Sequence, residues 1–141
     1  AVANLLEYGV QPHDVYKRCY ESYPKNFFLF QNYCLNKAEF LYDDKVAYTT
    51  VYKKDVEKFG VGPDCTEGLT EKLRAISTTE IAFLAKEIGN GLTKFSLRSK
   101  SIDVASICAN FGGGGHKFAA GCVIKAPLKS AVEKVLEKIE L

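Results

Sequence analysis

The sequence has no methionine, no tryptophan and only two histidines among its 141 residues. It has no run of eighteen apolar residues, so no membrane-spanning helix is predicted. The first ten residues, AVANLLEYGV, lack the basic and apolar regions of a signal peptide. A hydrophobic fraction of 47% and a charged fraction of 26% are typical of one globular domain and argue against disorder.

The cysteines are odd in number and widely spaced, and they form no CxxC pair or zinc-type Cys/His cluster. They are Cys19, Cys34, Cys65, Cys108 and Cys122. We expect reduced, partly buried thiols in a cytoplasmic protein, and no catalytic cysteine. The neighbouring acids Asp43 and Asp44 have no further ligand nearby in the sequence, so no metal site is predicted in this chain.

The charge of the chain is unevenly distributed, although its net value is only +2. Between residues 94 and 125 there are five Lys or Arg residues and one acid, Asp103, which gives this segment a charge of +4. The rest of the chain is therefore slightly negative. A small anionic ligand would be favoured near the positive segment.

The residue patterns predict an α+β domain with a mixed β-sheet of about four to five strands and helices packed on it. The tail of a helix is expected at 1–8, ended by Gly9. Further helices are expected near 12–22, along a stripe from Phe27 to Leu41, at 53–60, at 64–76 behind a capping box of Asp64 and Glu67, at 101–111 with Ser101 or Asp103 as the cap, and at 127–141. Strands are expected at 45–52, 80–88, 92–99 and 117–125, with a hairpin turn at 89–91.

The segment FGGGGHKFAAGC, residues 111–122, is the most unusual in the chain. Successive glycines can adopt positive φ angles at little cost, so their N–H groups can turn into one concavity that binds phosphate or carboxylate oxygens. His116 and Lys117 follow and add donors. Ala119, Ala120 and Gly121 keep the next strand thin, as a ligand lying over it would require.

Three other interpretations of the glycine run are weaker. A flexible linker is typical of longer glycine tracts, whereas this one lies between an amphipathic helix and an apolar strand. A Walker loop requires Lys and then Ser or Thr after its last glycine, and His116 stands there instead. A dinucleotide fingerprint lies between a strand and a helix, which is the reverse of the order predicted here.

Arg98 is the second candidate for anion binding, because a guanidinium can hold a phosphate through two parallel hydrogen bonds. It lies at the end of a predicted strand, with Ser96 on its own face and Ser99 next to it. An exposed, solvated arginine is the alternative for this residue alone. His13, next to Asp14 at a helix start, has no such context and is interpreted as a surface or capping residue.

The segment SLRSKSIDVASICANFGGGGHKFAAG, residues 96–121, resembles the DHH-associated domain of DHH-family phosphoesterases. More narrowly, it is similar to the bacterial oligoribonuclease and 3′-phosphoadenosine-5′-phosphate phosphatase type. The family pattern matches at Arg98-Ser99, along the helix from Val104 to Ala109, and through GGGGH and AAG. Thr66 to Leu69 is also similar to a Thr-Glu-Gly-Leu segment of that family.

The resemblance implies a two-lobed hydrolase of which this chain is the C-terminal, substrate-binding lobe. Residues 24–141 would form the DHH-associated domain, and residues 1–23 would be linker helices from an N-terminal catalytic lobe that is missing from the sequence. That lobe would hold two Mn²⁺ ions through its Asp-His-His motif, which this chain lacks. The chain alone is therefore expected to have no catalytic residue and no cofactor.

Binding roles are the only ones that the resemblance transfers to this chain. The residues expected to bind substrate phosphates are Arg98, Ser99, Gly112, Gly113, Gly114, Gly115 and His116. The expected partners are short RNA or nucleotide phosphates and the missing lobe, through which the protein could form a homodimer. No membrane partner is expected.

Several functions remain open at this point. The parent enzyme could hydrolyse short RNA or 3′-phosphoadenosine-5′-phosphate, or it could be a cyclic-dinucleotide phosphodiesterase or an exopolyphosphatase-related protein. The chain could also be a non-catalytic nucleotide-binding module. An accessory domain like that of alanyl-tRNA synthetase is the weakest alternative, because its glycine segment is built differently.

Overall fold

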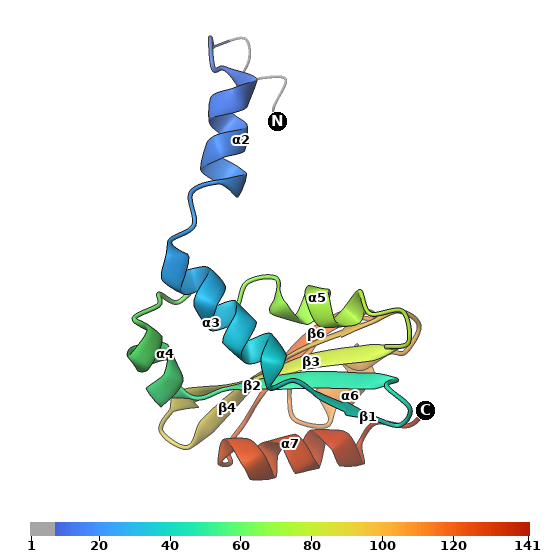
Figure 1. The fold of residues 1–141 in the computed structure, drawn as a ribbon. Coiled ribbons are helices and arrows are strands. Elements are labelled where there is room, and N and C mark those ends of the chain that lie inside the picture. Colours follow the sequence, from blue (N-terminus) through green and yellow to red (C-terminus); the bar gives the residue numbers. More distant parts are fainter. Residues whose placement is uncertain (1–7) are drawn as a thin grey trace.

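The computed structural model describes residues 8–141, in which six strands form one sheet with helices on both faces (Figure 1). The strand order is β1-β2-β3-β4-β6-β5. Strands β2 and β3 are parallel, and every other neighbouring pair is antiparallel. The predicted α+β class with a mixed sheet is confirmed, and the sheet has two short strands more than the four that the sequence patterns located.

The strands are β1 (Glu39–Leu41), β2 (Val46–Val51), β3 (Ile81–Gly89), β4 (Leu92–Ser99), β5 (Gly114–His116) and β6 (Ala119–Ile124). The helices are α2 (Pro12–Tyr20), α3 (Lys25–Asn36), α4 (Lys53–Phe59), α5 (Leu69–Arg74), α6 (Val104–Ala109) and α7 (Leu128–Glu137).

The first correction concerns the helical stripe that was expected to continue to Leu41. Helix α3 ends at Asn36, and Glu39–Leu41 forms β1 instead. The reason is the turn that follows, in which Tyr42, Asp43 and Asp44 all have positive φ angles. This turn reverses the chain and pairs β1 with β2, which an amphipathic pattern alone does not reveal.

The second correction concerns the helix expected from Asp64. Residues 63–68 form turns, and helix α5 begins only at Leu69, after Gly68 with a φ of 79°. A positive φ is incompatible with a continuous right-handed helix, so the predicted capping box is absent. Gln31 holds the turn instead, since its amide nitrogen donates to the carbonyl oxygens of Cys65 and Glu67 at 3.2 and 2.7 Å.

Three hydrophobic clusters cover the two faces of the sheet, one on the first face and two on the second. One face packs on α6 and α7 through side chains that include Phe83, Phe95, Leu97 and Val135, all fully buried. On the other face, α3 and α5 cover β2 and β3 with residues that include Phe30 and Leu69. Alternation along β4 places Lys94, Ser96 and Arg98 on this second face, as the sequence predicts.

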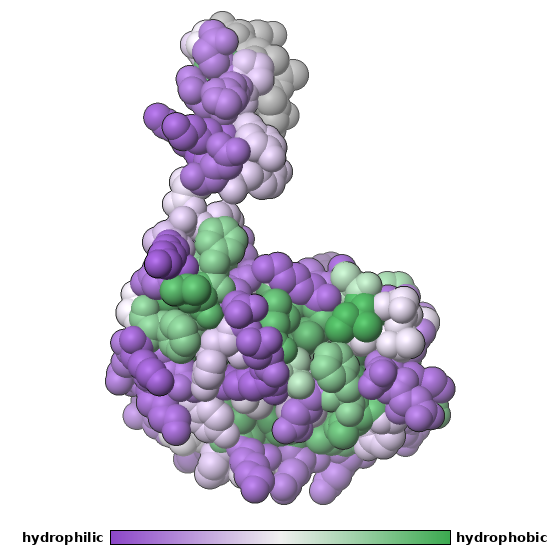
Figure 2. Space-filling view, viewed as in Figure 1, coloured by the Kyte–Doolittle hydropathy of each residue, from purple (hydrophilic) through white to green (hydrophobic). Residues whose placement is uncertain are grey.

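The N-terminal helix α2 stands away from the sheet and buries none of its residues (Figure 1). Figure 2 shows a mostly hydrophilic surface on α2 and apolar side chains gathered over α3. The helix expected before Gly9 falls on residues 1–7, which lie outside the described part. From residue 8 onward, no helix is long and apolar enough to cross a membrane.

Candidate phosphate-binding site

The strand register brings Arg98 and His116 onto the same face of the sheet. Arg98 on β4 pairs with Ala119 on β6, and Ala119 pairs with His116 on β5. Directly paired residues share a face, and neighbouring strands lie about 4.8 Å apart, so the two backbones are separated by about 10 Å. Only the methyl group of Ala119 stands between them.

A shallow hollow of about 600 Å³ lies beside this row. The next cross-strand row consists of Ser96, Gly121 and Gly114, so its centre and one end carry no side chain. The hollow is lined by Lys94, Ser96, Arg98, the 111–114 segment and residues 119–123 of β6. Its floor is therefore backbone and small side chains, and its rim is cationic.

The glycine run does not form the expected series of positive φ angles. Gly112 has a φ of 75° and ends α6, but the next positive φ is at Gly115, and residues 114–116 form the edge strand β5. The reason is close packing on β6. A Cβ on Gly113 would lie 2.5 Å from the Cβ of Cys122 and would also collide with the carbonyl oxygen of Gly121.

Gly114 differs from its neighbours in the run. It has no positive φ, and a Cβ added to it would meet no atom within 4 Å. Packing and backbone conformation therefore explain the glycines at positions 112, 113 and 115, but not the one at 114. The free space above Gly114 belongs to the hollow that Arg98 also lines.

Both ends of the glycine segment are anchored to the domain by backbone hydrogen bonds. The amide of Gly113 donates to the carbonyl of Cys108 at 3.0 Å. In the β5–β6 turn, the carbonyl of Lys117 accepts from the amide of Val104 at 2.9 Å, and that of Phe118 accepts from Ser99 at 3.1 Å. The predicted cap of α6 is confirmed for Asp103, whose side chain accepts from the amide of Ser106 at 3.1 Å.

Arg98 is held in place by a residue that sequence reasoning missed. Its Nε donates to a carboxylate oxygen of Glu71 on α5 at 3.0 Å, and its Nη1 donates to the carbonyl of Leu97 at 2.9 Å. These contacts leave guanidinium N–H groups available to a ligand. Glu71 follows the Thr66–Leu69 motif closely, but only the packing of α5 over β4 shows that it reaches Arg98.

The structure does not bring Ser99 together with the other candidate residues. Alternation along β4 turns it to the opposite face from Arg98, where it is 3% exposed and its hydroxyl donates to the carbonyl of Ile102. Ser99 therefore holds the segment that leads into α6. It is not in position to contact an anion in the hollow.

Four of the five cysteines are buried, and Cys19 is exposed. Burial raises the pKa of Cys34 to about 11. A hydrogen bond to Cys122, together with burial, raises the pKa of Cys108. Cys34 and Cys108 are therefore protonated at neutral pH. All four buried cysteines pack as small residues of the interior, as the sequence predicts.

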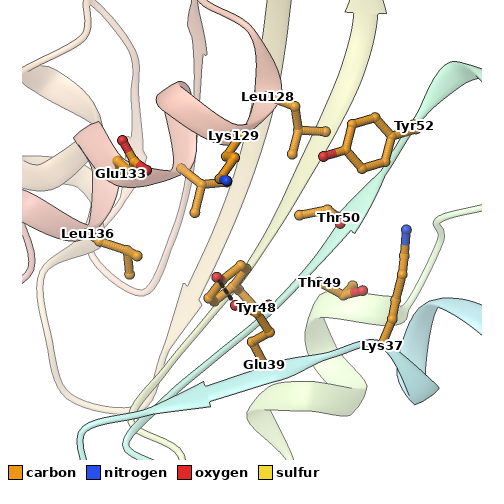
Figure 3. Close-up of a pocket in the computed structure, with 11 residues that line it drawn as sticks. Lys37, Glu39, Tyr48, Thr49, Thr50, Tyr52, Leu128, Lys129, Glu133 and Leu136 are labelled. Atoms are coloured by element: carbon orange, nitrogen blue, oxygen red, sulfur yellow. Dashed lines mark hydrogen bonds between the residues drawn. The ribbon is translucent and has the colours of Figure 1, made fainter.

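A second pocket, of about 270 Å³, lies on the opposite face between β2 and α7 (Figure 3). Tyr48 and Glu39 point toward each other there, and the tyrosine hydroxyl donates to the carboxylate. Burial and then this hydrogen bond raise the pKa of Tyr48. The ring of Tyr48 also stacks on Phe83 at a centroid distance of 4.8 Å, so the pair ties the β1 edge to the core.

Within residues 8–141, no group of three His, Cys, Asp or Glu side chains is arranged to hold a metal ion. The described residues therefore do not fit the two Mn²⁺ ions that the resemblance implies for the parent enzyme. No step of a metal-dependent reaction is assigned to this chain. The hollow instead presents cationic side chains and exposed glycine backbone, which suit the binding of an anion.

The family model of the DHHA1 domain matches residues 43–141. The chain belongs to the DHHA1 family. The resemblance to a DHH-associated domain is thereby confirmed, and the hollow lies entirely within the matched residues.

The similar proteins place the DHHA1 domain within longer chains. An uncharacterized protein of Mycoplasma pneumoniae, the MG371 homolog, is 29% identical over 123 residues, which are 86% of this chain and 37% of that protein. An exopolyphosphatase-related protein from Bacteroides fragilis has a similar fold with a TM-score of 0.83 and 24% identity, covering 97% of this chain and 41% of that one. This sequence thus spans about two fifths of each of these relatives.

More distant structures share the fold of the DHHA1 domain. The pGpG-specific phosphodiesterase PggH from Vibrio cholerae matches with a TM-score of 0.52 and 15% identity over 81% of this chain and 39% of its own. The C-Ala domain of alanyl-tRNA synthetase from Aquifex aeolicus matches with a TM-score of 0.52 and 20% identity, covering 72% of this chain and 96% of the domain. These likenesses show the fold alone.

Proposed function

We propose that this DHHA1 domain binds the phosphate groups of a nucleotide or short RNA, as the substrate-binding lobe of a DHH-family phosphoesterase. The observation that carries the proposal is the row formed by Arg98, Ala119 and His116, next to the open space above Gly114. A phosphate seated there would receive charge-assisted hydrogen bonds from the guanidinium and the imidazole.

The backbone of β5 adds to this arrangement. It is the outermost strand of the sheet, so part of its N–H groups have no partner strand and are available to an oxyanion. Contacts of this kind fix the position of a phosphate and carry no information about base identity. The domain would therefore select a ligand by the number and spacing of its phosphates.

The parent protein is proposed to be a hydrolase whose two Mn²⁺ ions are bound by a separate N-terminal lobe. Residues 1–23 would then be the linker to that lobe, and residues 24–141 the DHHA1 lobe that closes over the substrate. The names of the exopolyphosphatase-related and pGpG-specific relatives support a phosphoester or phosphoanhydride substrate. We favour short RNA or 3′-phosphoadenosine-5′-phosphate.

The binding half of the proposal is tested by calorimetry of the 141-residue chain with a 5′-phosphorylated dinucleotide. His116→Ala is expected to weaken binding by about 1–3 kcal/mol, the usual cost of a lost charge-assisted hydrogen bond. Arg98→Lys is expected to weaken it as well, because an ammonium cannot replace the planar fork. Lys134→Gln, on the far side of the sheet, is the matched control. Equal affinities for all four proteins would contradict the site.

The catalytic half is tested with the full-length parent protein and Mn²⁺. Hydrolysis of a dinucleotide or of 3′-phosphoadenosine-5′-phosphate is expected, and it should fall in the His116→Ala and Arg98→Lys variants. A substrate panel that includes pGpG and inorganic polyphosphate distinguishes the possible substrates. A full-length protein that cleaves none of these compounds would contradict the assignment to a phosphoesterase.

A further inference from the structure

Two lysines stand directly opposite each other beside the proposed phosphate site. Lys86 on β3 pairs with Lys94 on β4, so the two side chains leave the same face of the sheet as Arg98. Like charges directly opposite on an antiparallel pair are destabilising unless another group compensates. The position therefore carries an electrostatic cost that needs an explanation.

Among residues 8–141, no acid pairs with either lysine. Lys86 and Lys94 form no ion pair within 4.0 Å and no side-chain hydrogen bond there, in contrast to Lys37 and Arg98, which are each paired with a carboxylate. The two positive charges are thus left unpaired by the described residues. An anion from outside the chain would remove the repulsion.

The two lysines also border a hollow of their own, of about 200 Å³. Its polar lining consists of these ammonium groups with Thr66 and Ser96, and its apolar lining consists of Pro63, Leu84 and Ile88. Lys94 and Ser96 line the larger hollow as well, so the two hollows are neighbours along β4. A ligand held at Arg98 that follows β4 would pass Ser96 and Lys94 before it meets Lys86.

We propose that the Lys86–Lys94 pair is a second anion subsite, which binds a further phosphate of a linear oligonucleotide whose first phosphate lies at Arg98 and Gly114. This inference rests on the proposed function. Arg98 and Lys94 are four residues apart on β4, or about 13 Å at the usual rise of a strand, and Lys86 lies one strand further away. Glu71 and the carbonyl of Leu97 hold the guanidinium at its own end, so a chain of two or three nucleotides is needed to reach from Arg98 to Lys86.

The apolar residues of the smaller hollow indicate which class of linear polyanion would fit the two neighbouring hollows. Pro63, Leu84 and Ile88 offer contact area to a sugar or a base, and Ile88 is 42% exposed. An inorganic polyphosphate has no apolar group to place there. The ligand class that fits both subsites is therefore a single-stranded oligonucleotide of two or more residues.

The test is calorimetry of the 141-residue chain with adenosine 5′-monophosphate, the dinucleotide pApA, the trinucleotide pApApA and tripolyphosphate, at several salt concentrations. The variant is Lys86→Gln, because Lys86 borders only the smaller hollow whereas Lys94 also lines the larger one. The control is Lys134→Gln on α7, which removes the same charge from the opposite face. Circular dichroism checks that all three proteins are folded.

The Lys86→Gln variant is expected to lose about threefold to tenfold in affinity for pApA and pApApA at low salt, with a salt slope reduced by about 1. Its affinity for the mononucleotide should stay within about twofold of wild type, because Lys86 does not line the larger hollow that holds a single phosphate at Arg98. The control should behave like wild type with every ligand.

Four results would overturn the inference, and they are distinguishable. Unchanged affinity of the lysine variant for pApA would exclude the subsite while leaving the Arg98 site intact. An equal loss in the control would indicate a general charge effect. Tripolyphosphate that binds as tightly as pApA, with the same loss, would exclude the nucleotide assignment. If wild type bound none of the four compounds, the proposed function itself would fail.

Discussion

Over β2 and β3, the small side chains of Ala47 and Ala82 are fully buried against Leu73 of α5. Over β4 and β6, on the same face of the same sheet, Ala119 and Gly121 are only partly buried and line an open hollow. In the first region small residues allow a helix to approach. In the second they leave room that the described chain does not fill, and the nearest long side chains are cations.

The comparison teaches that a small residue has to be interpreted together with what packs above it. Helix α5 packs over Ala82, so a larger side chain at Ala82 should lower the stability of the fold. The space over Ala119 and Gly114 is open, so a larger side chain there should weaken ligand binding instead. Of the four predictions below, given from the largest expected effect to the smallest, the first two test this division directly. The other two test the contacts that position Arg98 and the helix before the glycine run.

Gly113→Ala is expected to lower the free energy of unfolding by about 3 kcal/mol, because its Cβ would collide with the backbone and side chain of β6. Gly114→Ala should change the stability by less than about 0.5 kcal/mol and should weaken dinucleotide binding. Urea unfolding and calorimetry measure both. Similar stability losses in the two variants would remove the distinction between packed and open glycines.

Ala82→Leu is expected to destabilise the domain by about 1–3 kcal/mol through overpacking beneath α5. Ala119→Leu adds the same side chain to the open half, where it should leave stability nearly unchanged and obstruct the space between Arg98 and His116. The two variants are compared by thermal unfolding and by affinity for a dinucleotide. A larger loss of stability for Ala119→Leu would show that the hollow is closed in solution.

Glu71→Gln is expected to change the free energy of unfolding by no more than about 0.5 kcal/mol, because its ion pair with Arg98 is partly exposed and screened by water. The small difference should disappear at high salt. Thermal unfolding at two salt concentrations measures it. A large, salt-independent loss would indicate that the pair supports the fold rather than only positioning the guanidinium.

Asp103→Ala is expected to have the smallest effect, and one that depends on pH. The hydrogen bond from the amide of Ser106 lowers the pKa of Asp103 below its usual 3.8, so the carboxylate stabilises the folded state above that pH and ceases to do so as it protonates. The difference in urea midpoint between wild type and variant should therefore shrink below about pH 4. Ser130→Ala removes a hydroxyl that donates to the carbonyl of Pro127 rather than to a carboxylate, and it should show no such trend.

Much of the fold could be predicted from the sequence because the long helices and strands have a clear hydrophobic periodicity or clear turn residues. The β3–β4 hairpin, helix α7 and the amphipathic helix before the glycine run each have a periodicity or a turn signal of their own. The two short strands, β1 and β5, have no such signal. β1 depends on three consecutive non-glycine residues with positive φ, and β5 on packing of glycines against β6, and neither is visible in a hydrophobic pattern.

The candidate site follows from the sequence in part. Arg98 and the glycines were found as separate motifs, and only the register of β4, β6 and β5 places them in one row. Ser99 belongs to the candidate residues because the Arg98-Ser99 pair matches the family pattern, although adjacent residues of a strand face opposite sides. Glu71, Lys86 and Lys94 carry no motif, and their relation to the hollow requires the three-dimensional structure.

The hydrogen bonds that anchor the glycine segment at Cys108, Val104 and Ser99 have a consequence for how a ligand would associate. A tract of four glycines free in solution would lose much conformational entropy on closing around a phosphate. Here that entropy is already lost when the domain folds, so recognition resembles docking onto a rigid surface. The temperature dependence of affinity should then reflect desolvation and charge, with little contribution from ordering of the loop.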